Sequence, residues 1–214
     1  MKYADRRDAG RRLAARLLHL KDRRPVVLAL PRGGVAIGFE IAQALAAPLD
    51  IVLVRKIGVP WQSELALGAV SDGPASDIFI DRDLARSLAI PETYIAAETK
   101  TQLEEIERRR SSYIAGRPPI EIAGGTAIVD DDGIATGATM RVALRAVRRR
   151  GPARLVLAVP VAPPETLAEF RTEADEIVCL QSPPAFGAIG FYYRDFHQMS
   201  DAEVTALLAA APSA

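Results

Sequence analysis

The sequence predicts an α/β protein with a doubly wound, mostly parallel β-sheet. Continuous apolar runs of strand length alternate with longer stretches that carry apolar residues at helical spacing, the order that gives parallel strands joined by crossover helices. The runs are apolar throughout, as expected when helices cover both faces of a sheet. Polar or glycine-rich residues follow three of the runs, at the strand ends where such sheets bind ligands.

The first part of the chain predicts a βαβ unit with a right-handed crossover. Residues 5–20 carry Ala9, Leu13, Leu17 and Leu20 on one side and arginines on the other, which indicates an amphipathic helix with Asp5 as its cap. The remaining elements of the unit are a buried strand at 26–30, a glycine turn at 31–34, a helix at 35–46, and a second buried strand at 49–54 that ends in Arg55-Lys56.

The middle of the chain predicts less regular structure. Residues 57–73 indicate an irregular loop and a short strand, with 78–80 as a hairpin partner. A short helix is expected at 81–88 and a long one from 91 to about 113. Its Arg108-Arg109-Arg110 run is expected to be a solvated helix end, with a phosphate-binding role as the alternative.

The second part continues the strand and helix alternation. The expected elements are a strand at 126–130, a helix at 137–150, a strand at 155–161, a helix at 164–174, a strand at 176–180, and a terminal helix at 201–210. An aromatic tail precedes the last helix. We expect one domain over residues 1–214, with a core at 24–180 and a tail at 181–200.

Composition narrows the function classes. Lys+Arg and Asp+Glu are equal at 27 each, so net charge favours neither nucleic acid nor a membrane surface. Cys179 is the one cysteine, which excludes an internal disulfide and fits a reducing compartment; we expect it to be an inert core residue. No window reaches the length of an apolar membrane span, and the N-terminus lacks a signal-type apolar segment. These observations predict a cytoplasmic protein.

The stretch TAIVDDDGIATGATM, residues 126–140, is the strongest functional signal. A buried strand leads into three aspartates, a small-residue turn and a helix start. Backbone N–H groups of the turn, threonine hydroxyls and the helix dipole favour a phosphate. The acids suit sugar hydroxyls or a hydrated cation. The alternative is a surface run of acids before a capped helix.

Together with the basic and glycine-bearing ends at 31–34 and 55–56, this stretch suits 5-phosphoribosyl-1-pyrophosphate (PRPP), which carries phosphate at both ends and hydroxyls between them. VDDDGIATGAT resembles the PRPP-binding motif of the type I phosphoribosyltransferases. The resemblance implies that Asp131 and Asp132 bind the ribose hydroxyls and take part in catalysis. It implies that Ala135, Thr136, Gly137, Ala138 and Thr139 bind the 5′-phosphate. It also implies Mg²⁺ as the cofactor, with Asp131 and Asp132 as candidate ligands.

The pyrophosphate site implied by the resemblance comprises Arg32, Gly33 and Gly34, often with a non-proline cis peptide, and the basic pair Arg55 and Lys56. A glycine turn alone is common in βα units, so this part is less specific.

The sequence signals for the residues that would recognise the acceptor are less specific still. The resemblance implies a flexible catalytic loop within residues 58–117. There, Glu64 is a candidate general acid or base, with an ordinary salt bridge as the alternative. The resemblance also implies a small hood over the base, for which residues 181–200 are the candidate. Within it, Phe186, Phe191 and Tyr192 are candidates for stacking on a base, or for sealing a sheet edge. Ala135 replaces the acid that 6-oxopurine enzymes usually carry before the first threonine, which argues against hypoxanthine or guanine.

The resulting hypothesis is a phosphoribosyltransferase of nucleotide metabolism that moves the phosphoribosyl group of PRPP to or from a nitrogenous base. The alternative is a PRPP-sensing regulatory or binding protein without transfer activity. The expected partners are small molecules, with neither nucleic acid nor a membrane. A homodimer is common in the family, but the sequence specifies neither the oligomeric state nor the acceptor.

Overall fold

A five-stranded parallel sheet forms the centre of the computed structural model, which describes residues 2–72, 78–114 and 120–212. The strand order is β2–β1–β6–β7–β8, and each neighbouring pair is parallel. In that order the strands are Leu49–Ile51, Pro25–Ala29, Thr126–Asp130, Arg154–Val161 and Glu176–Gln181. The predicted α/β fold with a mostly parallel sheet is confirmed.

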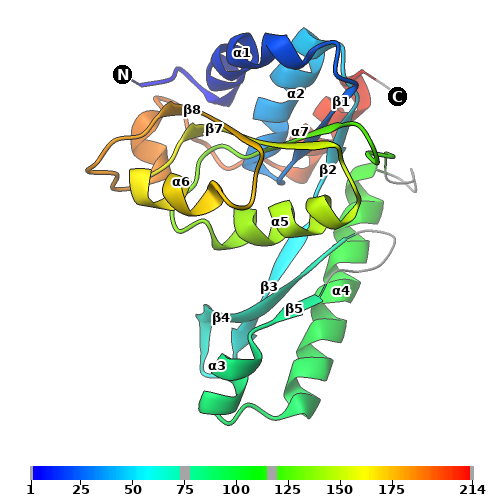
Figure 1. Ribbon diagram of the computed structural model, residues 1–214, viewed down its shortest axis with the longest axis vertical. Helices are drawn as coiled ribbons and strands as arrows, with labels where there is room; N and C mark the ends of the chain where they lie inside the picture. The colour runs from blue at the N-terminus through cyan, green and yellow to red at the C-terminus, as the bar shows by residue number, and fades with distance from the viewer. Residues whose placement is uncertain (1, 73–77, 115–119, 213–214) are drawn as a thin grey trace.

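Helices cover both faces of this sheet, so it is doubly wound as predicted (Figure 1). The helices α1 (Arg6–Leu17), α2 (Gly33–Leu45) and α7 (Asp201–Ala210) lie on one face, and α5 (Ala138–Arg149) and α6 (Pro164–Phe170) lie on the other. Because side chains alternate along a strand, Val27 and Ile128 pack in one core, whereas Leu28 and Val129 pack in the other. Asp5 caps α1 as expected, accepting a hydrogen bond from the backbone N–H of Asp8.

An arm leaves the core after β2 and projects away from it (Figure 1). It contains the antiparallel sheet β3–β4–β5 and the helices α3 and α4. These elements span Val54–Val59, Gln62–Ser71, Ile78–Ile80, Arg82–Ser87 and Glu92–Ile114. The expected pairing of residues 78–80 with the preceding strand is confirmed.

Two predictions for this region are wrong. Residues 49–54 do not form one strand, because β2 ends at Ile51 and the chain enters a different sheet at Val54. The irregular loop expected from residue 57 is wrong, because β3 and β4 pair across a turn at Pro60 and Trp61, whereas the short strand expected after it lies within β4. The pairing register shifts on both sides of Gly58, and such irregularities hide the alternating pattern that identifies a strand in sequence.

The expected solvated end of α4 is also wrong for Arg110. Its side chain is only 14% exposed and forms an ion pair with Asp72, while Nη2 lies 3.8 Å from Oδ2 of Asp50. Asp50 also accepts hydrogen bonds from the backbone N–H groups of Ile51 and Ile120. This buried cluster fastens the arm helix to the edge of the core sheet. Of the helices in the described ranges, none is long and apolar enough to cross a membrane.

Candidate active site

The turn after β1 lies directly against the acidic residues after β6. It contains a cis peptide bond between Pro31 and Arg32, as the resemblance implied. The backbone N–H of Leu30 donates to the carbonyl of Asp130 at 3.0 Å. A Cβ added to Gly34 would lie 3.0 Å from that same carbonyl oxygen, and one added to Gly33 would lie 1.9 Å from Asp132 Oδ2. Two consecutive glycines therefore allow this close approach.

Three consecutive aspartates begin at the last residue of β6. Asp130 is fully buried, and neither of its side-chain oxygens has a hydrogen-bond partner among the described residues. Asp131 Oδ1 accepts the backbone N–H of Asp132 at 2.8 Å. Asp132 Oδ2 accepts from Arg6 Nε, also at 2.8 Å. Burial raises the pKa of all three carboxyls; the neighbouring carboxylates add to this for Asp130 and Asp131, and Arg6 opposes it for Asp132.

The turn at 133–139 presents its middle to solvent. Ala135 and Thr136 are exposed, and Gly137 has φ of +76° at the start of α5. A Cβ on Gly137 would lie 2.8 Å from the ring of Phe170, so both the conformation and the space require glycine. Thr166 Oγ1 of α6 donates to the carbonyl of Ala135 at 3.1 Å, which fixes the position of the turn. The result is an exposed turn at a helix N-terminus without a side-chain cap, which suits an anion.

Arg55 and Lys56 lie on β3 of the arm, where they line a cavity of about 430 Å³ together with Thr139. Arg55 Nε donates to Gln102 Oε1 of α4 at 2.8 Å. The fold thus brings this basic pair beside the 133–139 turn, although the strand that carries it belongs to the second sheet. Arg32 instead has Nη1 3.7 Å from Asp201 Oδ1, at the start of α7.

The arm occupies most of the range in which a flexible catalytic loop was expected. Residues 73–77 and 115–119 lie outside the described residues. Glu64 lies on β4, but its side chain is also outside what the structure describes, so its catalytic role stays a prediction.

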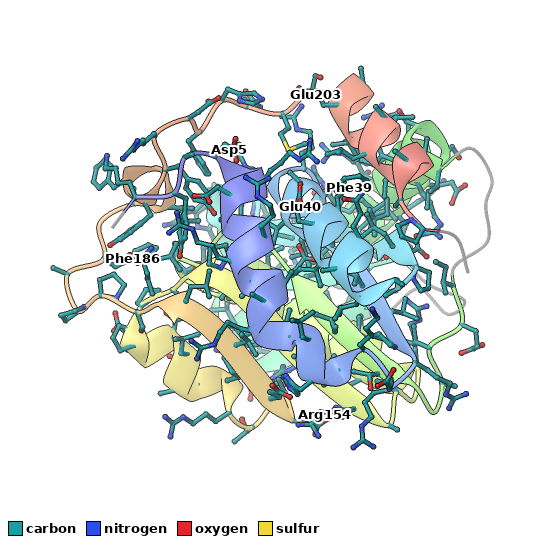
Figure 2. All side chains as sticks on the ribbon, turned by 90° about the horizontal axis from the view of Figure 1, so that it is seen from above. Asp5, Phe39, Glu40, Arg154, Phe186 and Glu203 are labelled. Carbon is teal, nitrogen blue, oxygen red and sulfur yellow. The ribbon has the colours of Figure 1, made fainter. Side chains whose placement is uncertain are left out.

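The aromatic residues of the tail divide into two groups. Phe186 stacks on Tyr192 with ring centroids 5.5 Å apart, and Phe191 is 66% exposed. Viewed from above, Phe186 lies far along the tail from Glu203 of α7 (Figure 2). Tyr193 instead reaches the acids, because its hydroxyl donates to the carbonyl of Asp132 at 2.6 Å. Base binding by Phe186, Phe191 and Tyr192 stays a prediction.

Sequence reasoning did not single out Arg6 or Tyr193. The sequence places the arginines of the first helix opposite its apolar side, yet Arg6 is only 8% exposed. Its spacing carried a signal, because Arg6 precedes Ala9, Leu13 and Leu17 by three, seven and eleven residues and so shares their buried face. Tyr193 stood in a dense aromatic run that offered no such periodicity.

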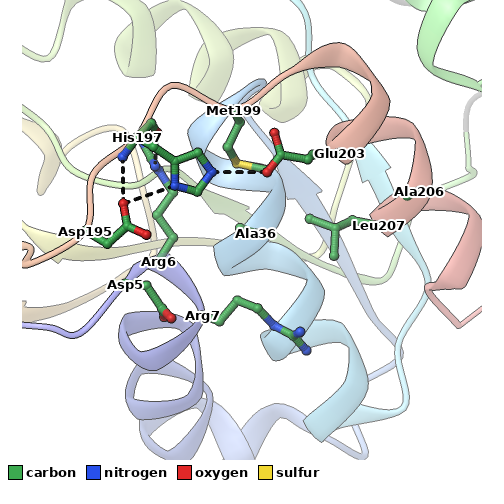
Figure 3. Close-up of a pocket in the computed structure, with 10 residues that line it drawn as sticks. All are labelled: Asp5, Arg6, Arg7, Ala36, Asp195, His197, Met199, Glu203, Ala206 and Leu207. Atoms are coloured by element: carbon green, nitrogen blue, oxygen red, sulfur yellow. Dashed lines mark hydrogen bonds and ion pairs between the residues drawn. The ribbon is translucent and has the colours of Figure 1, made fainter.

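A second cavity, of about 320 Å³, lies behind Arg6 between α1, α2 and α7 (Figure 3). Ala36, Met199 and Leu207 contribute apolar surface to it. At its rim the ring of His197 lies between Asp195 and Glu203, with each ring nitrogen 3.1 Å from a carboxylate oxygen. Those carboxylates raise the pKa of His197. Arg6 thus both lines this cavity and binds Asp132.

The fold and site define an α/β protein with acids and an anion-suited turn at the carboxyl ends of its parallel strands, where sheets of this kind bind ligands. The phosphoribosyl transferase domain model matches residues 79–195, which include the acids and the 133–139 turn. The chain belongs to this phosphoribosyl transferase family.

Similar proteins agree with that assignment. A curated Mycobacterium tuberculosis protein, provisionally named a phosphoribosyl transferase, is 45% identical over 206 residues, covering 96% of this chain and 46% of that protein. The chain thus spans about half the length of the curated relatives it matches. The crystal structure of TT1426 from Thermus thermophilus is 41% identical with a TM-score of 0.85, covering 99% of each chain. AQ2163 from Aquifex aeolicus shares the fold, with a TM-score of 0.51 at 16% identity over 86% of this chain and 83% of that one.

Proposed function

We propose that the protein transfers the 5-phosphoribosyl group of PRPP to or from a nitrogenous base, with pyrophosphate as the co-product. The observation that carries the proposal is the contact between the Gly33-Gly34 turn and the acids after β6, with an anion-suited turn at 133–139 beyond them. This arrangement offers separate groups for a diphosphate, a pair of hydroxyls and a terminal phosphate within one continuous strip.

The proposed reaction needs no covalent bond between the protein and the substrate. The bond between C1 of the ribose and pyrophosphate breaks, a nitrogen of the base forms a new bond to C1, and positive charge develops on the sugar ring between these events. Asp131 and Asp132 would accept the ribose hydroxyls and place negative charge near that ring. The backbone N–H groups of 135–139, with the hydroxyls of Thr136 and Thr139, would hold the 5′-phosphate. Catalysis is then positioning and charge stabilisation.

Gly33 and Gly34 would let the backbone approach the pyrophosphate, and Arg32, Arg55 and Lys56 would supply its positive charge. Arg32 would have to exchange its contact with Asp201 for the ligand, because its guanidinium is 3.7 Å from that carboxylate.

The residues present fit Mg²⁺ only as a largely hydrated, substrate-held ion. Among the described residues, no group of three or more His, Cys, Asp or Glu side chains could hold a metal. One Asp132 oxygen is already bound by Arg6, so Asp131 and the other Asp132 oxygen are the available carboxylate ligands. That set suits Mg²⁺, which usually takes one or two carboxylates plus substrate phosphates. When bound, the ion would neutralise charge on the departing pyrophosphate.

The test is pyrophosphate release from PRPP and Mg²⁺ with a panel of purine, pyrimidine and other nitrogenous bases. Release with at least one base supports the proposal. In calorimetry, the double substitution Asp131→Asn and Asp132→Asn is expected to abolish PRPP binding, whereas Asp22→Asn, at an exposed position, keeps it. Wild-type affinity in the double variant would reject the site. PRPP binding without turnover across the panel would favour a PRPP sensor instead.

A further inference from the structure

Arg6 makes three separate contacts and lies close to Gly33, although it belongs to the first turn of a surface helix. Its side chain is 9% exposed. Nε donates to Asp132 Oδ2 at 2.8 Å, and Nη1 donates to the carbonyl of His197, also at 2.8 Å. The guanidinium carbon lies 4.0 Å from the centroid of the Phe196 ring. A Cβ on Gly33 would approach Nε to 3.1 Å. Arg6 therefore has one well-defined position.

Asp132 is enclosed by Arg6 and by two further residues near it. Arg6 binds its side chain, the Tyr193 hydroxyl binds its backbone carbonyl, and Gly33 closes against Oδ2. Asp131 differs, because its carboxylate accepts the next backbone N–H along the chain. The orientation of Asp132 thus depends on α1 and on the tail, which lie outside the 126–140 motif.

The two side-chain oxygens of Asp132 differ in their hydrogen bonding. Oδ2 is committed to Arg6, whereas no hydrogen bond from another described residue reaches Oδ1. A carboxylate that holds an arginine with one oxygen has its plane and rotamer set, and can offer the other oxygen in a fixed direction. The hydrogen bond to the His197 carbonyl and the stacking on Phe196 hold the Arg6 guanidinium in place, so it would not move toward a bound ligand.

We propose that Arg6 is a positioning residue that orients Asp132 toward a ribose hydroxyl without touching the substrate itself. This inference rests on the proposed function, because it assumes that Asp132 binds ribose. It requires arginine rather than any cation, because one planar group must bond both Asp132 and the His197 carbonyl while lying on an aromatic ring.

The experiment compares two probes in calorimetry with Mg²⁺ present. Ribose 5-phosphate carries the hydroxyls that Asp132 would bind, whereas inorganic pyrophosphate does not. Arg6→Gln is expected to weaken ribose 5-phosphate roughly tenfold or more, which equals about 1.4 kcal/mol, and to leave pyrophosphate affinity unchanged. Arg6→Lys is expected to give a partial loss for the same probe alone.

Arg7→Gln is the matched control. Arg7 is the next residue of the same helical turn, but its ion pair is with Glu40 of α2 and its side chain is 52% exposed. It is expected to bind both probes as the wild type does. A double variant with Arg6→Gln and Asp132→Asn should bind ribose 5-phosphate no worse than Asp132→Asn alone, because the two residues would act as a unit.

Several outcomes would overturn the inference. One is wild-type affinity of folded Arg6→Gln for ribose 5-phosphate; another is an equal loss for both probes, which would indicate a general structural effect. Should Arg6→Gln fail to fold, as judged by circular dichroism, Arg6→Lys decides by the same selectivity. Absence of ribose 5-phosphate binding in the wild type would instead reject the proposed function, so the two failures are distinguishable.

Discussion

Replacing Asp130 by asparagine should stabilise the protein at neutral pH. Asp130 is fully buried at the end of β6, and neither carboxyl oxygen has a hydrogen-bond partner in the described part of the chain. Asparagine keeps the shape and removes the ionisation. Leaving a buried polar group unsatisfied costs about 1–3 kcal/mol, and a charged one costs more. We therefore expect a gain of at least about 1 kcal/mol near pH 8, which corresponds to about 2–4 °C in Tm for a chain of this size.

The effect should depend on pH in a defined direction. Burial, followed by repulsion from Asp131 and Asp132, raises the folded-state pKa of Asp130 above its unfolded value of about 3.9. A raised carboxyl pKa contributes stability that is fully present below the unfolded pKa and is lost as pH rises through the folded pKa. The asparagine variant lacks this loss. Its advantage over the wild type should therefore grow as pH rises and shrink as pH falls.

Urea unfolding of both proteins at several values between about pH 5 and about pH 8 measures this difference. Asp50→Asn is the matched control, because Asp50 is equally buried but its oxygens accept two backbone N–H groups. That variant should be less stable than the wild type. Equal stability of Asp130→Asn and the wild type near pH 8, or a difference that is constant with pH, would refute the reasoning.

Three further predictions concern single side chains. Gly33→Ala should abolish ribose 5-phosphate binding in calorimetry, because its Cβ would lie 1.9 Å from Asp132 Oδ2; retained affinity would contradict the geometry. Burial raises the pKa of Cys179 to about 11, so the thiol should react slowly with maleimide near neutral pH and faster as pH approaches that value; fast labelling of folded protein near neutral pH would disprove this. Arg110→Met should destabilise the protein by about 3–5 kcal/mol in urea unfolding, because it leaves Asp72 buried without its cation; a change below about 1 kcal/mol would contradict that role.

The core of the fold was predictable because its strands are apolar on both sides. Runs such as residues 26–30 and 155–161 admit few other interpretations, and the helices between them keep a regular apolar spacing. The arm was not predictable in the same way. Gly58, Pro60 and Trp61 suggest a loop; Pro60 and Trp61 do form a turn, but the residues on either side of it pair as β3 and β4. Cross-strand pairing in this hairpin outweighed the local propensity for a loop.

The candidate site also has a part that could be predicted from the sequence and a part that could not. The acids and the 133–139 turn come from one continuous stretch, so their order along the chain already placed them together. Arg6, Tyr193 and Arg110 reach their partners across 126, 61 and 38 residues, respectively. No short-range pattern reports such a pairing, and only the helical spacing of Arg6 hinted at its burial.

The enclosure of Asp132 has a consequence for the order in which the protein becomes competent. Arg6 joins Asp132 to the His197 carbonyl across sequence separations of 126 and 191 residues, so these loops must close before that carboxylate is oriented. Contacts between residues so far apart in sequence form late in folding, because the entropy of closing the loop is lost before the contact contributes any stability. During synthesis, a chain that has completed β6 and the turn after it already carries all the residues of the 126–140 motif. It acquires an oriented Asp132 only after residues 193–197 have emerged and met the first turn of α1.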